Sequence, residues 1–183
     1  MTRPAKAQSD ASPPSDAKRN FILQQGLGEP VAATCPVQYS ALHFQPRLVG
    51  LTVLVAAALQ APLVFFALAA VLWWGALVPR LNPFDALYNF TLARSSGMTL
   101  LPAPAPRRFA QFLAGSFALA TGVSLILGWR TTALVLEGFL MAAVAALVFG
   151  GFCLGSFIFH LLIGRAEFAK RTLPWANGPA GRA

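Results

Sequence analysis

The strongest constraint on this chain is a nearly unbroken apolar run that begins after Arg47 and reaches Val78. A single helix of about 31 residues would be about 47 Å long, whereas the hydrocarbon core of a bilayer is about 30 Å thick. A Gln-Ala-Pro sequence at residues 60–62 interrupts the run near its middle. The run therefore predicts two short membrane-spanning helices, at about residues 44–60 and 62–79, joined by a tight turn.

Two further apolar segments follow a proline-rich loop. The first extends from about residue 107 to 127 and the second, after a turn at Gly128, from about 132 to 160. Within the loop, an amphipathic stretch from Pro83 to Arg94 is typical of a short helix at a membrane interface. We therefore expect an all-α membrane protein, a four-span helical bundle of two hairpins with an interfacial helix in the central loop.

Composition favours this class of protein. Hydrophobic residues make up 56% of the 183 residues and charged residues only 11%, whereas soluble domains have about 25% charged residues. This excludes a soluble enzyme with an ordinary polar surface, and two cysteines are too few for a disulfide-rich secreted scaffold. The membrane domain is expected at residues 33–164, between two polar cytoplasmic tails at 1–32 and 165–183, with the first 20 residues disordered.

The basic residues are distributed unevenly about the expected spans. Four spans place both termini and the central loop on one side, together with every Lys and Arg except Arg130. Because basic residues concentrate on the cytoplasmic side, we expect both termini in the cytoplasm and a bacterial inner-membrane location. Contact with anionic lipid headgroups follows from the same charge. No nucleic-acid-binding motif accompanies these residues, so we expect no nucleic-acid role.

Three polar residues in the last apolar segment are candidates for chemistry. Cys153, Ser156 and His160 are spaced i, i+3 and i+7, so on a helix they share one face. Cys35 is expected on the same side of the membrane, which makes Cys35 and Cys153 candidate thiols for redox or sulfur relay, with His160 as a helper. The alternative is a packing seam with an inert buried cysteine. A zinc site from these residues lacks a fourth ligand, and we expect no metal or cofactor.

Small residues lie next to this group. Gly150 and Gly151 form a weak point in the expected helix. Gly151 and Gly155 form a small-xxx-small pair, which allows two helices to pack closely.

One carboxylate, Glu137, lies inside an apolar segment. An intramembrane carboxylate indicates a functional site, and its expected partners are Arg130 and Gln60. The alternative is that Glu137 marks the outer interface and that the span runs over residues 138–160, a length of about 34 Å.

Three motifs occur in a characteristic order. They are Cys35-Pro36 before the first span, Asn82-Pro83-Phe84 followed by Pro106-Arg107-Arg108-Phe109-Ala110, and Phe152-Cys153-Leu154-Gly155 within Phe149 to His160. With these motifs, residues 33–164 resemble the bacterial membrane-protein family called domain of unknown function 4395. The resemblance implies a four-helix membrane fold without a settled activity. Many members read Phe-Cys-x-Gly-Cys, which suggests thiol or sulfur handling, whereas Ser156 stands at the second cysteine position here.

Three functions remain open. A non-catalytic accessory or assembly subunit that packs against other subunits of a larger membrane complex is favoured by the Gly- and Ala-rich helix faces, the short hairpins and the missing second cysteine. A redox or sulfur-relay protein that uses Cys153 and Cys35 is the alternative. A small-solute transporter is third, because intramembrane polar residues are scarce. No motif for a nucleophilic triad, phosphate loop or haem pair assigns a reaction.

Overall fold

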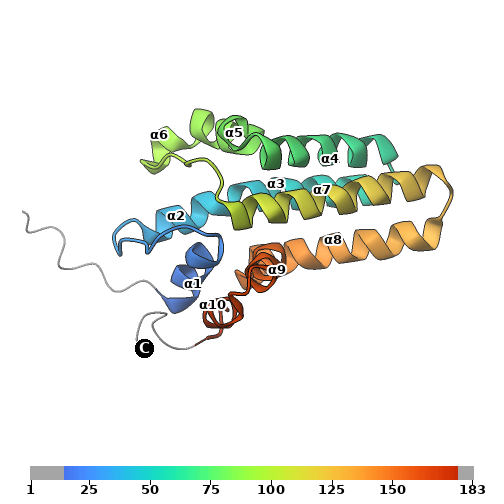
Figure 1. Ribbon diagram of the computed structural model, residues 1–183. Coiled ribbons are helices and arrows are strands. Elements are labelled where there is room, and N and C mark those ends of the chain that lie inside the picture. The colour runs from blue at the N-terminus through green and yellow to red at the C-terminus, as the bar shows by residue number, and fades with distance from the viewer. Residues whose placement is uncertain (1–14, 177–183) are drawn as a thin grey trace, which may run out of the picture.

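The computed structural model describes residues 15–176, which form helices joined by short turns and loops (Figure 1). No strand occurs in this part of the chain, which confirms the predicted all-α class. In chain order the elements are α1 (Asp16–Gln24), α2 (Cys35–Leu42), α3 (Phe44–Ala58), α4 (Pro62–Leu77), the 3-10 turn η1 (Pro79–Leu81), α5 (Pro83–Thr91), α6 (Ala93–Ser96), α7 (Ala105–Ile126), α8 (Arg130–Gly150), α9 (Leu154–Leu162) and α10 (Ala166–Arg171).

Four helices, α3, α4, α7 and α8, pack around a common core. Each contacts two of the others in the ring order α3–α4–α7–α8, and the contact between α4 and α7 is the most extensive. All four helices contribute buried apolar side chains to the core: Val49, Val53, Ala56, Phe65, Leu68, Ala69, Leu72, Ala118 and Leu140. The predicted helical bundle is therefore confirmed.

The two hairpins turn where breaking residues interrupt the apolar runs. α3 ends at Ala58 and α4 begins at Pro62, whose fixed φ suits the first turn of a helix. Between them, Gln60 has a φ of 48°, a left-handed conformation. Gly128, in the second hairpin, has a φ of 73°, which glycine adopts without a steric penalty. Both turns lie at the same end of the bundle (Figure 1).

The short helices gather at the opposite end of the bundle (Figure 1). Among them, α5 is the helix expected in the central loop. Its Tyr88 is buried, whereas Leu87 is exposed. The apolar face of α5 is therefore divided between the bundle and the surroundings.

The last apolar segment is two helices instead of the single helix predicted over residues 132–160. α8 ends at Gly150 because Gly151 takes a left-handed conformation, with a φ of 61°. The N–H of Gly151 bonds the carbonyl oxygen of Leu147 and the N–H of Phe152 bonds that of Ala146, both over 3.1 Å, so these carbonyls of the last turns are paired where the helix stops. α9 then begins after a short extended stretch.

The two expected polar tails are folded where the structure describes them. Residues 1–14 and 177–183 lie outside the described residues, so the predicted disorder stays a prediction for residues 1–14. For residues 16–20 the prediction is wrong, because they belong to α1. α1, however, buries Phe21 and Ile22 completely, and α10 buries Ala169. The three consecutive apolar residues 21–23 are too weak a pattern to predict a helix from sequence. The stability of α1 comes from docking on the rest of the chain.

Within residues 15–176, three helical segments are long and apolar enough to cross a membrane: Cys35–Ala58, Ala105–Ile126 and Arg130–Gly150. The remaining bundle helix, α4, is apolar but has only 16 residues. These segments are compatible with a membrane protein.

Candidate functional site

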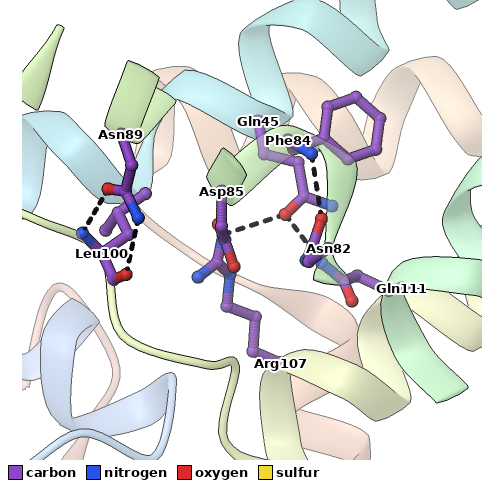
Figure 2. A network of polar contacts seen from close by, with 8 residues as sticks. All are labelled: Gln45, Asn82, Phe84, Asp85, Asn89, Leu100, Arg107 and Gln111. Atoms are coloured by element: carbon purple, nitrogen blue, oxygen red, sulfur yellow. Dashed lines mark hydrogen bonds and ion pairs between the residues drawn. The ribbon is translucent and has the colours of Figure 1, made fainter. Parts of the chain in front are cut away.

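A buried ion pair lies where the short helices meet the bundle. Nη2 of Arg107, near the start of α7, donates to Oδ1 of Asp85, near the start of α5, over 2.6 Å (Figure 2). Both side chains are less than a tenth exposed. Burying a charge costs free energy unless an opposite charge lies beside it. Asp85 and Arg107 each provide this opposite charge for the other.

Two glutamines extend this pair across the bundle. Oε1 of Gln45, on α3, accepts hydrogen bonds from Nη2 of Arg107 over 3.0 Å and from Nε2 of Gln111 over 2.7 Å (Figure 2). Arg107 and Gln111 are four residues apart on α7, so they lie on one face of that helix. These four residues, Gln45, Asp85, Arg107 and Gln111, are called the polar network, and they join α3, α5 and α7.

Some atoms of the polar network have no partner. Within residues 15–176, Oδ2 of Asp85 and Oε1 of Gln111 are buried and make no hydrogen bond. Burial raises the pKa of the Asp85 carboxyl, while the charge and the hydrogen bond of Arg107 act in the opposite direction. The ionised carboxylate therefore depends on Arg107.

Asn82 fixes the start of α5 and with it the position of Asp85. Its Oδ1 accepts a hydrogen bond from the backbone N–H of Phe84 over 3.1 Å, an N-cap bond. A Cβ on Gly75 of α4 would come within 3.0 Å of the Asn82 side chain, so only glycine allows this contact without a shift. Farther along α5, Asn89 bonds both backbone polar groups of Leu100 (Figure 2).

Cys153 and His160 are both held by Gln24 of α1. The backbone N–H of Cys153 donates to Oε1 of Gln24 over 2.8 Å, and Nε2 of His160 donates to the backbone oxygen of Gln24 over 3.1 Å. Cys153 immediately precedes α9, so Gln24 satisfies one of the N–H groups that a helix start leaves free. Burial lowers the pKa of His160, which keeps its ring neutral at pH 7.

The two predicted thiols are free and buried. Cys35 packs in an apolar cluster with Phe21, Ile22 and Leu42. Ser156 and His160 share the buried face of α9, whereas Cys153 lies just before that helix. Within residues 15–176, no three His, Cys, Asp or Glu residues are grouped so that they could hold a metal ion.

The three glycines predicted to pack have different roles. A Cβ on Gly155 would come within 2.6 Å of the Cβ of Ala110, so α9 approaches α7 closely there. Gly151 ends α8 and does not share a helix with Gly155, so the predicted small-xxx-small pair does not form. Gly150 has open space where a Cβ would be.

Glu137, on α8, is buried and contacts the first hairpin. Nε2 of Gln60 lies 3.2 and 3.3 Å from the two carboxylate oxygens of Glu137, and it also bonds the backbone oxygen of Ala57 over 2.7 Å. Gln60 is thus the partner that the structure gives Glu137. The other expected partner, Arg130, is exposed and forms no ion pair within the described residues.

A cavity of about 180 Å³ lies inside the bundle, and the polar network forms part of its wall. Most of the wall is apolar and comes from α3, α7 and α8. Gln45, Arg107 and Gln111 line it from the polar network, and Gln25 and Cys153 line it from the segments beside α1 and α9.

A protein-family model matches residues 37–163, and its description is "Domain of unknown function (DUF4395)". The chain belongs to the DUF4395 family. The match confirms the resemblance seen in the sequence. It includes the polar network, Cys153 and His160, but neither α1 nor Cys35. No match was found among curated proteins or solved structures.

From sequence, the thiols of this DUF4395 protein stand out but the polar network does not. Asp85 and Arg107 look like solvated charges of the inner membrane surface, and Gln45 and Gln24 look like ordinary polar residues. One signal does exist, because Arg107 and Gln111 lie on one face of a largely apolar helix. Polar side chains that such a helix buries need hydrogen-bonding partners.

Proposed function

We propose that this DUF4395 protein is a four-span protein of the bacterial inner membrane with both termini in the cytoplasm. In this proposal it is a non-catalytic accessory or assembly subunit that packs against a larger membrane complex. The spans are α3, α4, α7 and α8, and the end with the polar network lies at the cytoplasmic surface. α4 is short for a bilayer, and local thinning accommodates a short span.

The distribution of basic residues supports this orientation. Within residues 15–176, Arg130 is the only Lys or Arg at the end with the hairpin turns (Figure 1). The others lie in or beside the short helices and in the first turns of α3 and α7. Basic residues near span ends favour the cytoplasmic side and attract anionic headgroups.

The observation that carries the proposed role is that the two buried charges of the polar network, Asp85 and Arg107, are paired with each other. Arg107 also donates to Gln45, and Nε2 of His160 donates to Gln24, while Nδ1 of His160 is buried without a partner within residues 15–176. A general acid or base must instead reach a proton of the substrate. Polar groups that are used in this way stabilise the fold, which suits a non-catalytic subunit.

The outer face of α8 is apolar and exposed, as docking of a partner in the membrane requires. Leu134, Val135 and Phe139 are each more than half exposed. In a membrane, lipid chains or apolar helices of another protein cover such a face.

The thiol relay and the transporter gain less support. The Cys153 residue is 3% exposed and Cys35 is fully buried, whereas a reactive thiol is accessible to its substrate. The polar residues that line the cavity lie toward one end, and a solute path needs polar groups along its length.

The test is purification of the chain from native membranes in mild detergent, with mass spectrometry of the proteins that co-migrate. We expect a larger membrane protein in fixed stoichiometry. A Cys35→Ser/Cys153→Ser variant should retain this partner and the cellular phenotype, because serine preserves the packing. A chain that migrates alone, or a phenotype lost in the serine variant with assembly intact, would contradict the proposal.

A further inference from the structure

The cavity inside the bundle has a polar end and an apolar end. Gln111 lies near the start of α7, at the level of the short helices, while Phe117 lies six residues farther along, about 9 Å deeper in the bundle. Leu72 and Leu140 line the same apolar part. A ligand that fits both ends is an amphiphile.

Two buried atoms at the polar end have no partner. Within residues 15–176, Nε2 of Gln25 and Oε1 of Gln111 make no hydrogen bond, and each residue is 4% exposed. One atom is a donor and the other an acceptor. Leaving such atoms unpaired costs free energy, so a ligand group that both accepts and donates a hydrogen bond fits this end of the cavity. A hydroxyl does both.

The charge at the polar end favours a neutral ligand. The guanidinium of Arg107 is already paired with Asp85 over 2.6 Å, so the two charges cancel. An anionic carboxylate or phosphate would have to be desolvated with no free positive charge to compensate.

We propose that this cavity binds the hydroxyl end of a single-chain lipid alcohol. A cavity of about 150 Å³ holds a benzene molecule, so a cavity of about 180 Å³ accommodates the hydroxyl and the first few carbons of the chain. The cavity is open on one side, and two of the residues that line it, Phe139 and Leu154, are exposed. The rest of the hydrocarbon chain of the ligand passes through this open side into the bilayer. This inference uses the membrane location proposed above but not the subunit role.

The test uses purified protein in detergent and a hexadecanol that carries a photoactivatable group near its hydroxyl. Ala143→Phe fills the cavity from α8, and Ala142→Phe, on the neighbouring exposed residue, is the matched control. We expect cross-links to cavity residues that fall about tenfold in Ala143→Phe and stay unchanged in Ala142→Phe. Equal labelling of both variants would overturn the proposal, because it indicates labelling of the outer surface.

A second variant keeps the test decisive if Ala143→Phe fails to fold. Gln25→Leu removes a donor that bonds nothing in the described chain, so it should fold and bind hexadecanol about three- to tenfold more weakly. Unchanged binding by Gln25→Leu would contradict the proposed polar contact.

Competition with unlabelled compounds tests the head group. Hexadecanol should displace the probe better than palmitate at about pH 8, where a carboxylate is ionised, and better than hexadecane. If palmitate competes equally or better, the neutral hydroxyl is the wrong ligand class. If hexadecane competes equally, the polar end plays no part in binding and the proposal fails. Each readout is independent of whether the protein has a partner subunit.

Discussion

Gln24 and Cys153 are 129 residues apart in the chain, yet Oε1 of Gln24 accepts a hydrogen bond from the backbone N–H of Cys153 over 2.8 Å. The bond fastens α1 to the start of α9. It also places α1 beside Cys153, whose side chain is buried. The stability of this corner of the molecule should therefore depend on Gln24.

Replacing Gln24 by leucine should destabilise the protein by about 1–3 kcal/mol, because it leaves the buried N–H of Cys153 without an acceptor. Thermal unfolding in detergent measures the change, and alkylation of Cys153 should become faster as α1 detaches. Gln38→Leu is the control, because the half-buried Gln38 side chain makes no hydrogen bond within the described residues. Equal effects of the two substitutions would show that the Gln24 bond contributes nothing.

His160 should make the same contact sensitive to acid. Burial lowers the pKa of His160 below its ordinary value of 6.5. The folded chain therefore favours the neutral ring, and the stability that this ring contributes is present above about pH 6.5 and is lost as the pH falls through the folded pKa.

The His160→Gln variant isolates this effect, since its amide can donate to Gln24 at every pH. The melting temperature of the unmodified protein should fall more between about pH 7.5 and about pH 5.5 than that of the variant. Parallel curves for the two proteins would mean that His160 does not titrate with unfolding.

The Asp85–Arg107 pair should matter more than a surface ion pair. Arg107→Gln leaves the Asp85 carboxylate buried without its counter-charge, which should cost about 3–5 kcal/mol near neutral pH. Without Arg107, burial raises the pKa of Asp85 further above its ordinary value of 3.8. The stability of the variant should therefore be closest to that of the unmodified protein in acid. It should fall as the pH rises through the pKa of Asp85 in the folded variant.

The double variant Asp85→Asn/Arg107→Gln provides the control, because it has amides in place of both charges. Its unfolding temperature should show no such decline with rising pH and should exceed that of Arg107→Gln at neutral pH. If the single variant unfolds with the same pH dependence as the double, the pair is not the source of the effect.

The sequence predicts the helical hairpins well because their signals are local. Pro62 and Gly128 interrupt apolar runs at positions where few other structures fit. The end of α8 is harder to predict, because Gly150 and Gly151 mark a weak point but do not show whether the helix bends or stops. The left-handed conformation of Gly151 decides this.

The polar network and α1 depend on contacts between distant residues, so a single sequence does not reveal them. Asp85 and Arg107 are 22 residues apart, and the sequence does not show whether a charged residue is solvated or is buried and paired. Gln24 looks like part of a polar tail until α9 is placed beside it. The candidate thiols stand out by residue type, but their burial comes from the tertiary fold.

Gly155 and Gly150 offer a matched pair of substitutions. Gly155→Ala places a Cβ within 2.6 Å of the Cβ and 2.7 Å of the Cα of Ala110, so backbone must move. We expect a loss of about 1–3 kcal/mol. Gly150→Ala meets open space and should be neutral or slightly stabilising. Melting temperatures measure both, and equal melting temperatures of the two variants would contradict the close packing of Gly155 against Ala110.

Cysteine labelling in intact cells tests most directly whether the protein has four spans and a cytoplasmic end that carries the polar network. Single cysteines are placed in a Cys35→Ser/Cys153→Ser background at the exposed positions Leu59, Thr91, Thr131 and Glu167. A membrane-impermeant maleimide should label residues 59 and 131 in intact cells, and residues 91 and 167 only after lysis. Labelling of 91 or 167 in intact cells, or protection of 59 or 131, would contradict this topology.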